Sequence, residues 1–230
     1  MWTTHILKKG SILSFKGIKS GCRAYLAIGG GLSLPAIMDS KSTNLSSKFG
    51  GLDGRPLLKG DILSSNLPQN HLMTEGRTFP GEWILPYPGE WQLRVIFGPQ
   101  DDQFTPMGKK TFIDTSYQVS HRSDRTGIRL TGPMVERSPS IGESIISEGV
   151  VSGTIQIPGD GQPIIILVEI VTGGYRKIAT VITSDLPLLG QLKPGDKVKF
   201  KKITLDQAYR ALRKTEMRMD RFKERLSGPD

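Results

Sequence analysis

The sequence predicts an all-β protein that ends in one α-helix, and three observations support this class. The 230 residues include 27 glycines and 15 prolines, which separate short runs of β-branched and apolar residues. A turn motif with a basic residue, a glycine and then Ser or Asp recurs at residues 7–13, 58–63 and 192–198. The one convincing helical periodicity is at residues 205–226, near the end of the chain.

Four apolar runs are predicted to form strands: residues 24–28, 93–97, 164–168 and 179–182. Continuous apolar runs of this length are typical of strands that are buried on both faces. In the recurring turn motif, glycine supplies the positive φ of a tight turn, and the Asp or Ser side chain caps the local backbone. Because the motif recurs at unequal spacing, we expect two related β-barrel-like units and not a solenoid.

The junction between the two units is predicted within residues 80–88 or just after them. This stretch contains three prolines, which resist regular secondary structure. The first unit is therefore expected over residues 1–90, and the second unit, with the C-terminal helix, over residues 91–230.

The C-terminal helix is predicted from its start signal, its stop signal and its apolar stripe. Thr204 followed by Gln207 is a capping-box start, and Gly228-Pro229 is a stop. Apolar and small residues alternate at spacings of three and four: Leu205, Ala208, Leu212, Thr215, Met219, Phe222 and Leu226. Such a stripe favours packing against the sheet of its own domain, with a seam for a partner helix as the alternative.

Charge and composition exclude several classes of protein. The formal net charge is +9, and between Lys193 and Arg225 there are 12 Lys and Arg against 5 Asp and Glu. Within the helical part of this run, only Tyr209 and Phe222 interleave with the basic residues, so we interpret it as a solvated helix face and expect no nucleic acid partner. The longest apolar run, residues 164–168, is far below the ~20 residues of a membrane helix, and we expect no membrane association.

A metal or disulfide framework is not expected either. Cys22 is the single cysteine, and the three histidines have no Cys or carboxylate at ligand spacing. The first ten residues lack the apolar region of a signal peptide, so we expect a cytoplasmic protein. The sequence contains no Walker loop and no G-x-S-x-G elbow.

Candidate binding residues lie in three segments of the second unit. Arg125 and Arg129 are four residues apart, and in an extended strand they would share one face for a bidentate grip on carboxylate or phosphate. The alternative is that Asp124 pairs with a neighbouring Arg and braces a loop. Gln156 and Gln162 flank a turn, and Thr172, Gly173, Gly174 and Tyr175 form a later turn. Amides, hydroxyls and backbone N–H groups suit a small amide, carboxylate or carbamoyl group. We expect these groups to converge on one concave wall that a second polypeptide completes.

The same segments resemble a known family. The resemblance rests on residues 23–31, 40–43, 50–57, 98–102, 123–132, 153–163 and 172–175, in the expected order from about Trp2 to Leu226. The family is the allophanate hydrolase subunit 2 type, also named KipA or the C-type subunit of 5-oxoprolinase. It is similar to half of the carboxyltransferase domain of urea carboxylase.

This resemblance implies paired cyclophilin-like β-barrels and a partner that is KipI or the B-type subunit of 5-oxoprolinase. With a third protein, the A-type subunit, the family complex cleaves 5-oxoproline to glutamate using ATP, which is bound in the assembled complex. The implied substrate-binding residues are Arg125, Arg129, Gln156, Gln162, Thr172, Gly173, Gly174 and Tyr175. No residue is assigned a catalytic role, and the chain carries neither a metal site nor a biotin attachment motif.

The sequence departs from the family pattern in two places. The family begins with a further segment that includes a Q-D-x-G-R stretch, so the first barrel is expected to be incomplete at its N-terminal side. Before the Gly173-Gly174 turn, the family tends to have polar residues, whereas residues 168–171 are largely apolar and Arg176 replaces a proline. Two alternatives therefore stay open: a KipA-type regulatory protein that antagonises a histidine-kinase inhibitor, and the carboxyltransferase half of a urea carboxylase or allophanate hydrolase system.

Overall fold

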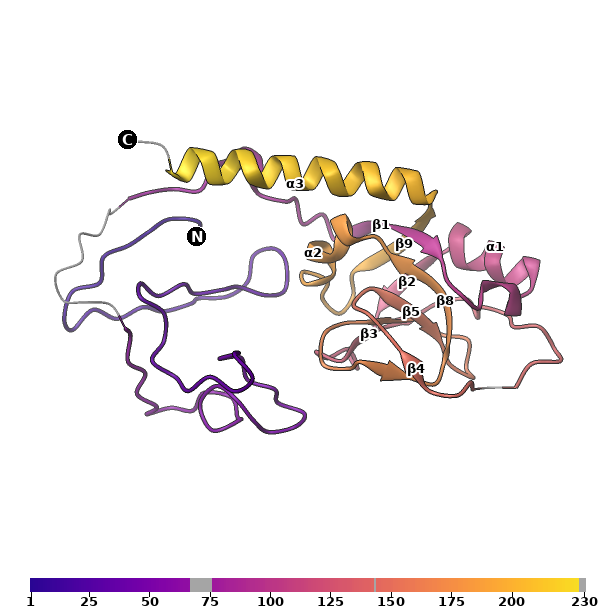
Figure 1. Cartoon of the computed structure of the whole chain (residues 1–230), viewed down its shortest axis with the longest axis horizontal. Coiled ribbons are helices and arrows are strands. Elements are labelled where there is room, and N and C mark those ends of the chain that lie inside the picture. Colours follow the sequence, from indigo (N-terminus) through magenta and orange to yellow (C-terminus); the bar gives the residue numbers. More distant parts are fainter. Residues whose placement is uncertain (67–75, 143, 228–230) are drawn as a thin grey trace. The chain divides into compact units, whose positions relative to one another are not determined.

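The computed structural model describes residues 1–66, 76–142 and 144–227 (Figure 1). The chain divides into two compact units, named here unit 1 and unit 2. Unit 1 consists of Met1–Gly17 and Ala24–Pro86, and unit 2 consists of Ile18–Arg23 and Tyr87–Asp230.

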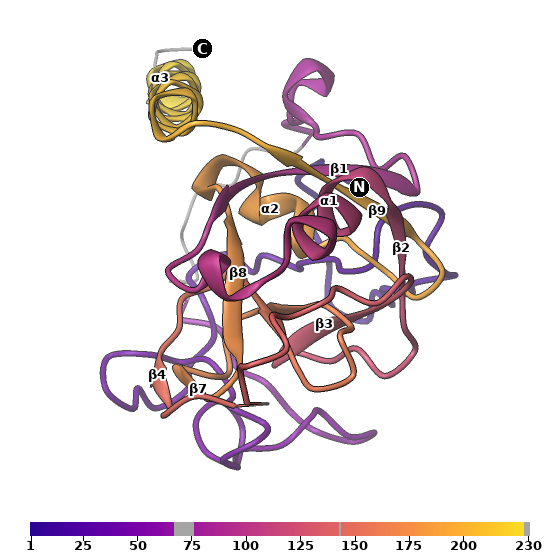
Figure 2. The same cartoon turned by 90° about the vertical axis from the view of Figure 1, so that its right-hand side faces the viewer.

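Seven strands of unit 2 form a closed barrel, which confirms the predicted all-β class (Figure 2). Their order around the barrel is β1-β8-β5-β6-β3-β2-β9. Neighbouring strands are antiparallel except for β9 and β1, which close the barrel in parallel. The barrel strands are β1 (Glu90–Phe97), β2 (Ser116–Val119), β3 (Gly127–Thr131), β5 (Thr154–Ile157), β6 (Ile164–Ile166), β8 (Arg176–Val181) and β9 (Lys197–Lys202).

One face of each strand fills the barrel interior. In β3, Ile128 and Leu130 are buried and the residue between them is exposed, as the period of two in a strand requires. Phe200 of β9 enters the same core, and its ring stacks on Phe112 of helix α1 (Pro106–Asp114) at a centroid distance of 4.4 Å. The interior is therefore a packed apolar core and not a cavity for a ligand.

Three of the four predicted strands are present. Residues 93–97 lie in β1, the first part of 164–168 forms β6, and most of 179–182 lies in β8. The prediction for residues 24–28 is wrong, because this segment is largely exposed and pairs with no strand among the described residues. An apolar run forms a strand only where a second strand completes its hydrogen bonds.

The predicted C-terminal helix is confirmed as α3 (Leu205–Ser227). The capping box is formed: the Thr204 N–H donates to Gln207 Oε1 at 2.9 Å, and the Gln207 N–H donates to Thr204 Oγ1 at 3.3 Å. Within unit 2, α3 packs mainly against the short helix η3 and does not lie across the sheet as expected. The predicted stop at Gly228-Pro229 lies outside the described residues. The other helical elements of unit 2 are η2 (Asp101–Gln103), η3 (Thr183–Asp185) and α2 (Leu186–Leu189).

Unit 1 has little regular secondary structure in its described part. It contains the short helix η1 (Gly81–Trp83) and isolated β-bridges such as Thr3 with Thr78. A bidentate ion pair braces one of its loops, with the Arg55 guanidinium at 2.7 and 2.9 Å from the two carboxylate oxygens of Asp61. These hydrogen bonds, together with one from the Leu58 N–H, lower the pKa of Asp61 to about 2. The partial first barrel over residues 1–90 stays a prediction. No helix in the described ranges is both long and apolar enough to cross a membrane.

Candidate functional site

A row of four residues crosses neighbouring strands on the outer face of the barrel. Gln156 of β5 pairs with Lys177 of β8 on one side and with Ile164 of β6 on the other. Ile164 pairs in turn with Arg129 of β3. Directly paired residues of antiparallel strands point to the same face. Lys177, Gln156, Ile164 and Arg129 therefore form one continuous row, named here the outer row.

A two-stranded ribbon covers the middle of the outer row. The ribbon pairs β4 (Glu148–Gly149) with β7 (Thr172–Gly173), and Figure 2 shows the two strands beside each other near one end of β8. Gln156 is only 3% exposed, and its Nε2 donates to the carbonyl oxygen of Tyr175 at 3.3 Å. A Cβ atom on Gly173 would lie 2.4 Å from Gln156 Nε2. The ribbon backbone thus rests directly on the amide, and Gln156 fixes the turn that follows β7.

Lys177 anchors the ribbon through an ion pair. Its ammonium group pairs with Glu148 Oε2, and the lysine side chain is 8% exposed. Gln100 bridges the pair, because its Nε2 donates to Glu148 Oε2 at 3.2 Å and its Oε1 accepts from the Lys177 N–H at 3.1 Å. The register of β5 against β8 shifts between Ile155 and Gln156, an irregularity of the kind that re-aims side chains at functional sites. The Lys177 ammonium, assisted by the Gln100 amide, holds the pKa of Glu148 below its usual value.

Arg176 is a buried anchor next to this network. Its Nε donates to Gln103 Oε1 and its Nη1 donates to the carbonyl of Gly142, each at 2.5 Å. Arg137 donates to the same carbonyl at 3.2 Å. Burial lowers the pKa of Arg176, and the nearby Arg137 guanidinium lowers it further. Arg176 therefore holds the neighbouring loop in place.

Arg125 does not lie beside Arg129 on one strand face as expected, because β3 begins only at Gly127. Arg125 Nε is 2.9 Å from Glu169 Oε1, and the Glu169 side chain is nearly buried. The expected alternative, an Asp124 ion pair, is also absent among the described residues. Asp124 Oδ1 instead accepts from the N–H groups of Thr126 at 2.8 Å and Gly127 at 3.1 Å. Arg125 is thus occupied by a structural ion pair at the start of the strand.

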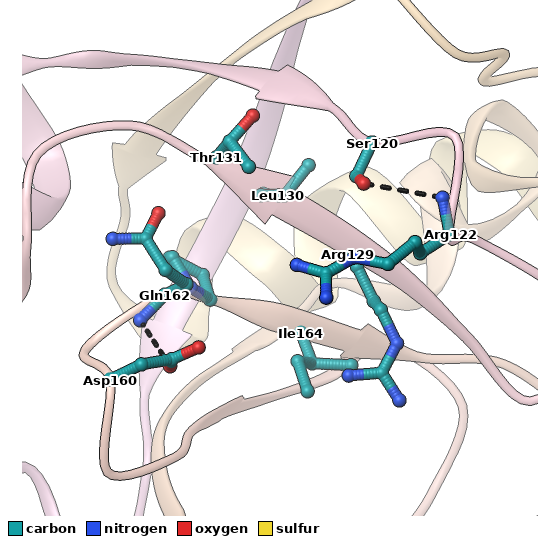
Figure 3. Close-up of a pocket in the computed structure, with 9 residues that line it drawn as sticks. Ser120, Arg122, Arg129, Leu130, Thr131, Asp160, Gln162 and Ile164 are labelled. Carbon is teal, nitrogen blue, oxygen red and sulfur yellow. Dashed lines mark hydrogen bonds between the residues drawn. The ribbon is translucent and has the colours of Figure 1, made fainter.

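A small pocket lies at the Arg129 end of the outer row (Figure 3). It has a volume of about 30 Å³, and both Arg129 and Arg122 line it. Figure 3 shows Gln162 and Asp160 on the opposite side of the pocket from the two arginines. The Gln162 amide is occupied by the backbone of Gly132, through bonds of 2.9 and 3.1 Å, so it braces a loop. Arg129 and Gln162 are the two sequence-predicted residues that line this pocket.

Most of the predicted site residues lie on one outer face of the barrel, where they form two separate groups. Gln156 and the turn residues Thr172, Gly173, Gly174 and Tyr175 form one cluster, while Arg129 and Gln162 line the pocket. Sequence reasoning missed Lys177, Glu148, Gln100 and Arg122. Two of these residues lay close to segments that the sequence had marked: Gln100 is in a segment that supports the resemblance, and Lys177 lies two residues after the late turn. No sequence signal pointed to Glu148, or favoured Arg122 over Arg125.

Residues 1–202 match the family described as the carboxyltransferase domain, subdomains A and B. The chain belongs to this family. It is 32% identical over 206 residues to the 5-oxoprolinase C subunit of Escherichia coli strain K12. This alignment covers 89% of this chain and 64% of that protein.

Two further comparisons agree with this membership. The chain is 32% identical over 218 residues to the 5-oxoprolinase C subunit of Haemophilus influenzae, covering 94% of this chain and 68% of that protein. The crystal structure of the K. lactis urea amidolyase aligns with a TM-score of 0.77 at 30% identity, over 84% of this chain and 13% of that chain. The carboxyltransferase-domain chain thus spans about two thirds of the length of the two bacterial relatives.

ATP, which the family resemblance implies, fits neither of two pockets among the described residues. Their volumes of about 30 and 220 Å³ are below the roughly 300–1,000 Å³ of typical small-molecule sites. The helix α1 begins at Pro106, directly after Thr105, and α3 follows Thr204, so neither begins with a glycine-rich phosphate loop. In the described ranges, no group of three His, Cys, Asp or Glu residues is placed to hold a metal ion.

We expect the ribbon to loosen under acid conditions through Glu148. The folded pKa of Glu148 lies below its ordinary value of 4.5. The ion pair with Lys177 therefore contributes its full stability above pH 4.5, and this contribution is lost as the pH falls through the folded pKa. Amide hydrogen exchange of the ribbon, followed from pH 6 to pH 3, should show this step.

The variant Glu148→Gln should remove the acid step and give fast ribbon exchange at all pH values. Glu90→Gln is the matched control, because Glu90 pairs with the exposed Lys197 at 3.6 Å on another part of the barrel. An unchanged acid step in Glu148→Gln would show that another group controls the ribbon.

Proposed function

We propose that this chain is the C-type subunit of an ATP-dependent 5-oxoprolinase, which converts 5-oxoproline to glutamate. It would act with a KipI-type protein, which is the B-type subunit, and with an A-type subunit. The proposal is supported by 32% identity to two proteins named as the C subunit of 5-oxoprolinase. The family resemblance implies ATP, and we propose that the partners hold it, since neither of the two described pockets of this chain has room for a nucleotide.

The observation that carries the proposal is the turn fixed by Gln156. Within the described residues, the N–H groups of Gly174 and Tyr175 donate no hydrogen bond. Unpaired backbone N–H groups are donors of the kind that suit a carbonyl oxygen or an oxyanion. Because Gln156 holds the Tyr175 carbonyl, the orientation of these donors is set by a buried side chain. A lactam carbonyl needs such donors when it is attacked, so this turn is the proposed place for it.

Reconstitution of the three subunits tests the proposed function. The complete set should convert 5-oxoproline to glutamate with matched ATP consumption, and omission of this chain should abolish turnover. Gln156→Glu, which keeps the size of the side chain but removes the N–H donor to Tyr175, should reduce turnover by about 10-fold or more. No 5-oxoproline-dependent ATP consumption by the complete set would refute the proposal.

A KipA-type regulatory role is the second candidate, and the segment before the turn favours it. Val168 and Val171 are 71% and 73% exposed. Exposed apolar residues next to a binding turn suit a protein–protein contact. This role predicts a tight complex with a KipI-type protein and no ATP consumption with or without 5-oxoproline. If the same reconstituted set instead carboxylates urea when a biotin-carrying partner is added, the carboxyltransferase alternative applies.

A further inference from the structure

Two arginines in the barrel carry charged groups that no other side chain neutralises in the described part of the chain. Arg94, Arg125, Arg137 and Arg176 each contact a carboxylate, an amide or a backbone carbonyl. Among the described residues, by contrast, the guanidinium groups of Arg122 and Arg129 take part in no ion pair or hydrogen bond. Both line the same pocket (Figure 3).

The loop between β2 and β3 holds Arg122 next to Arg129. The Arg122 N–H donates to Ser120 Oγ at 3.2 Å, and the Ser120 N–H donates to the Arg129 carbonyl at 2.8 Å. Ser123 Oγ accepts from the Arg129 N–H at 3.0 Å and also lies 3.3 Å from the Arg129 carbonyl. These contacts attach the backbone of the loop to the strand at Arg129, and both arginines line the same pocket.

The pocket, of about 30 Å³, has room for a small anionic group only, and the surface beside it is apolar. Asp160 is the carboxylate in the lining, and its Oδ1 accepts from the Gln162 N–H at 3.0 Å, on the side away from the arginines. Ile164, which pairs directly with Arg129, and Pro163 provide an apolar surface. Each guanidinium group can bind a carboxylate, or a phosphate, through two hydrogen bonds, and the apolar surface beside the arginines favours an organic acid.

We propose that Arg122 and Arg129 form the carboxylate-binding subsite for a small organic acid whose ring or chain rests on Ile164. This rests on the proposed function, for which 5-oxoproline is the acid. Arg129 and Gln156 lie two strand spacings apart, roughly 10 Å between backbones. In the proposed arrangement, the carboxylate is held at the arginines and the body of the molecule lies along the outer row, toward the turn at residues 172–175.

Binding to the full chain alone tests this subsite without any turnover. The 15N-labelled protein would be titrated with 5-oxoproline, with pyrrolidin-2-one, which lacks the carboxylate, with acetate and with inorganic phosphate. We expect the arginine Nε–H signals to shift with 5-oxoproline and acetate, and affinity for pyrrolidin-2-one to be at least 10-fold weaker than for 5-oxoproline. Arg129→Ala and Arg122→Ala should each weaken 5-oxoproline binding about 10-fold or more, and Arg129→Lys should weaken it less.

Arg125→Ala is the matched control, because its guanidinium is paired with Glu169, and it should leave the affinity unchanged. Unchanged affinity in both Arg129→Ala and Arg122→Ala, or phosphate binding tighter than any carboxylate, would overturn the subsite. If acetate and 5-oxoproline bind equally and both need the arginines, the subsite is supported while the proposed substrate is not. Because both arginines are exposed, their loss should not unfold the barrel, and the amide spectrum of each variant checks this.

Discussion

Replacing Asp196 with alanine should destabilise the barrel by about 2–4 kcal/mol. Asp196 is 4% exposed and lies at the start of β9, where the barrel closes. Its Oδ2 accepts from the buried Trp91 Nε1 at 3.0 Å and from the Lys193 N–H at 3.1 Å, and its Oδ1 accepts from Lys193 Nζ at 2.6 Å. Alanine leaves the indole and backbone N–H groups without acceptors in the interior, whereas the half-exposed lysine can be hydrated.

Urea unfolding followed by tryptophan fluorescence measures this loss. Asp220→Ala is the matched control, because Asp220 also pairs with a lysine three residues away, but at an exposed site on α3. We expect the control to change stability by less than about 0.5 kcal/mol. Asp196→Asn retains an acceptor and should fall between the two. Equal effects of Asp196→Ala and Asp220→Ala would mean that the buried hydrogen bonds contribute nothing to stability.

Replacing Gly173 with alanine should displace the ribbon from Gln156 and reduce turnover of the reconstituted enzyme by about 100-fold. The added Cβ would lie 2.4 Å from Gln156 Nε2, closer than atoms can approach. The backbone of Gly173 does not have a positive φ, so the effect comes from this contact and not from backbone strain. A shift of about 1 Å in a binding turn is enough for a loss of this size. The overpacked site should also cost about 1–3 kcal/mol of stability.

Gly149→Ala provides the matched control within the same ribbon. Gly149 lies on the other strand and pairs with Thr172, and a Cβ atom there would meet nothing within 4 Å. Turnover and melting temperature of Gly149→Ala should match the unmodified chain. If Gly173→Ala also retains full turnover and an unchanged Gln156 side-chain amide signal, the turn is not part of the working site.

Local sequence predicts best those elements whose hydrogen bonds join residues only a few positions apart. The helix α3 begins at its predicted capping box because Thr204 and Gln207 satisfy each other's backbone N–H groups. The run at residues 93–97 became a strand because β8 and β9 lie on either side of it. Residues 24–28 are as apolar, yet they are not a strand, since no partner strand pairs with them in the described part of the chain.

The barrel class, the C-terminal helix and the segments that carry polar binding groups can therefore be predicted from local patterns. Which of those polar groups come into contact depends on how the strands pair in the folded chain. Strand register places Gln156 between Lys177 and Ile164. Arg125 forms an ion pair with Glu169, and it is Arg122 that lines the pocket together with Arg129. Strand pairing and ion pairing join residues that are far apart in the chain, and a local sequence pattern does not specify which distant residue a given side chain will contact.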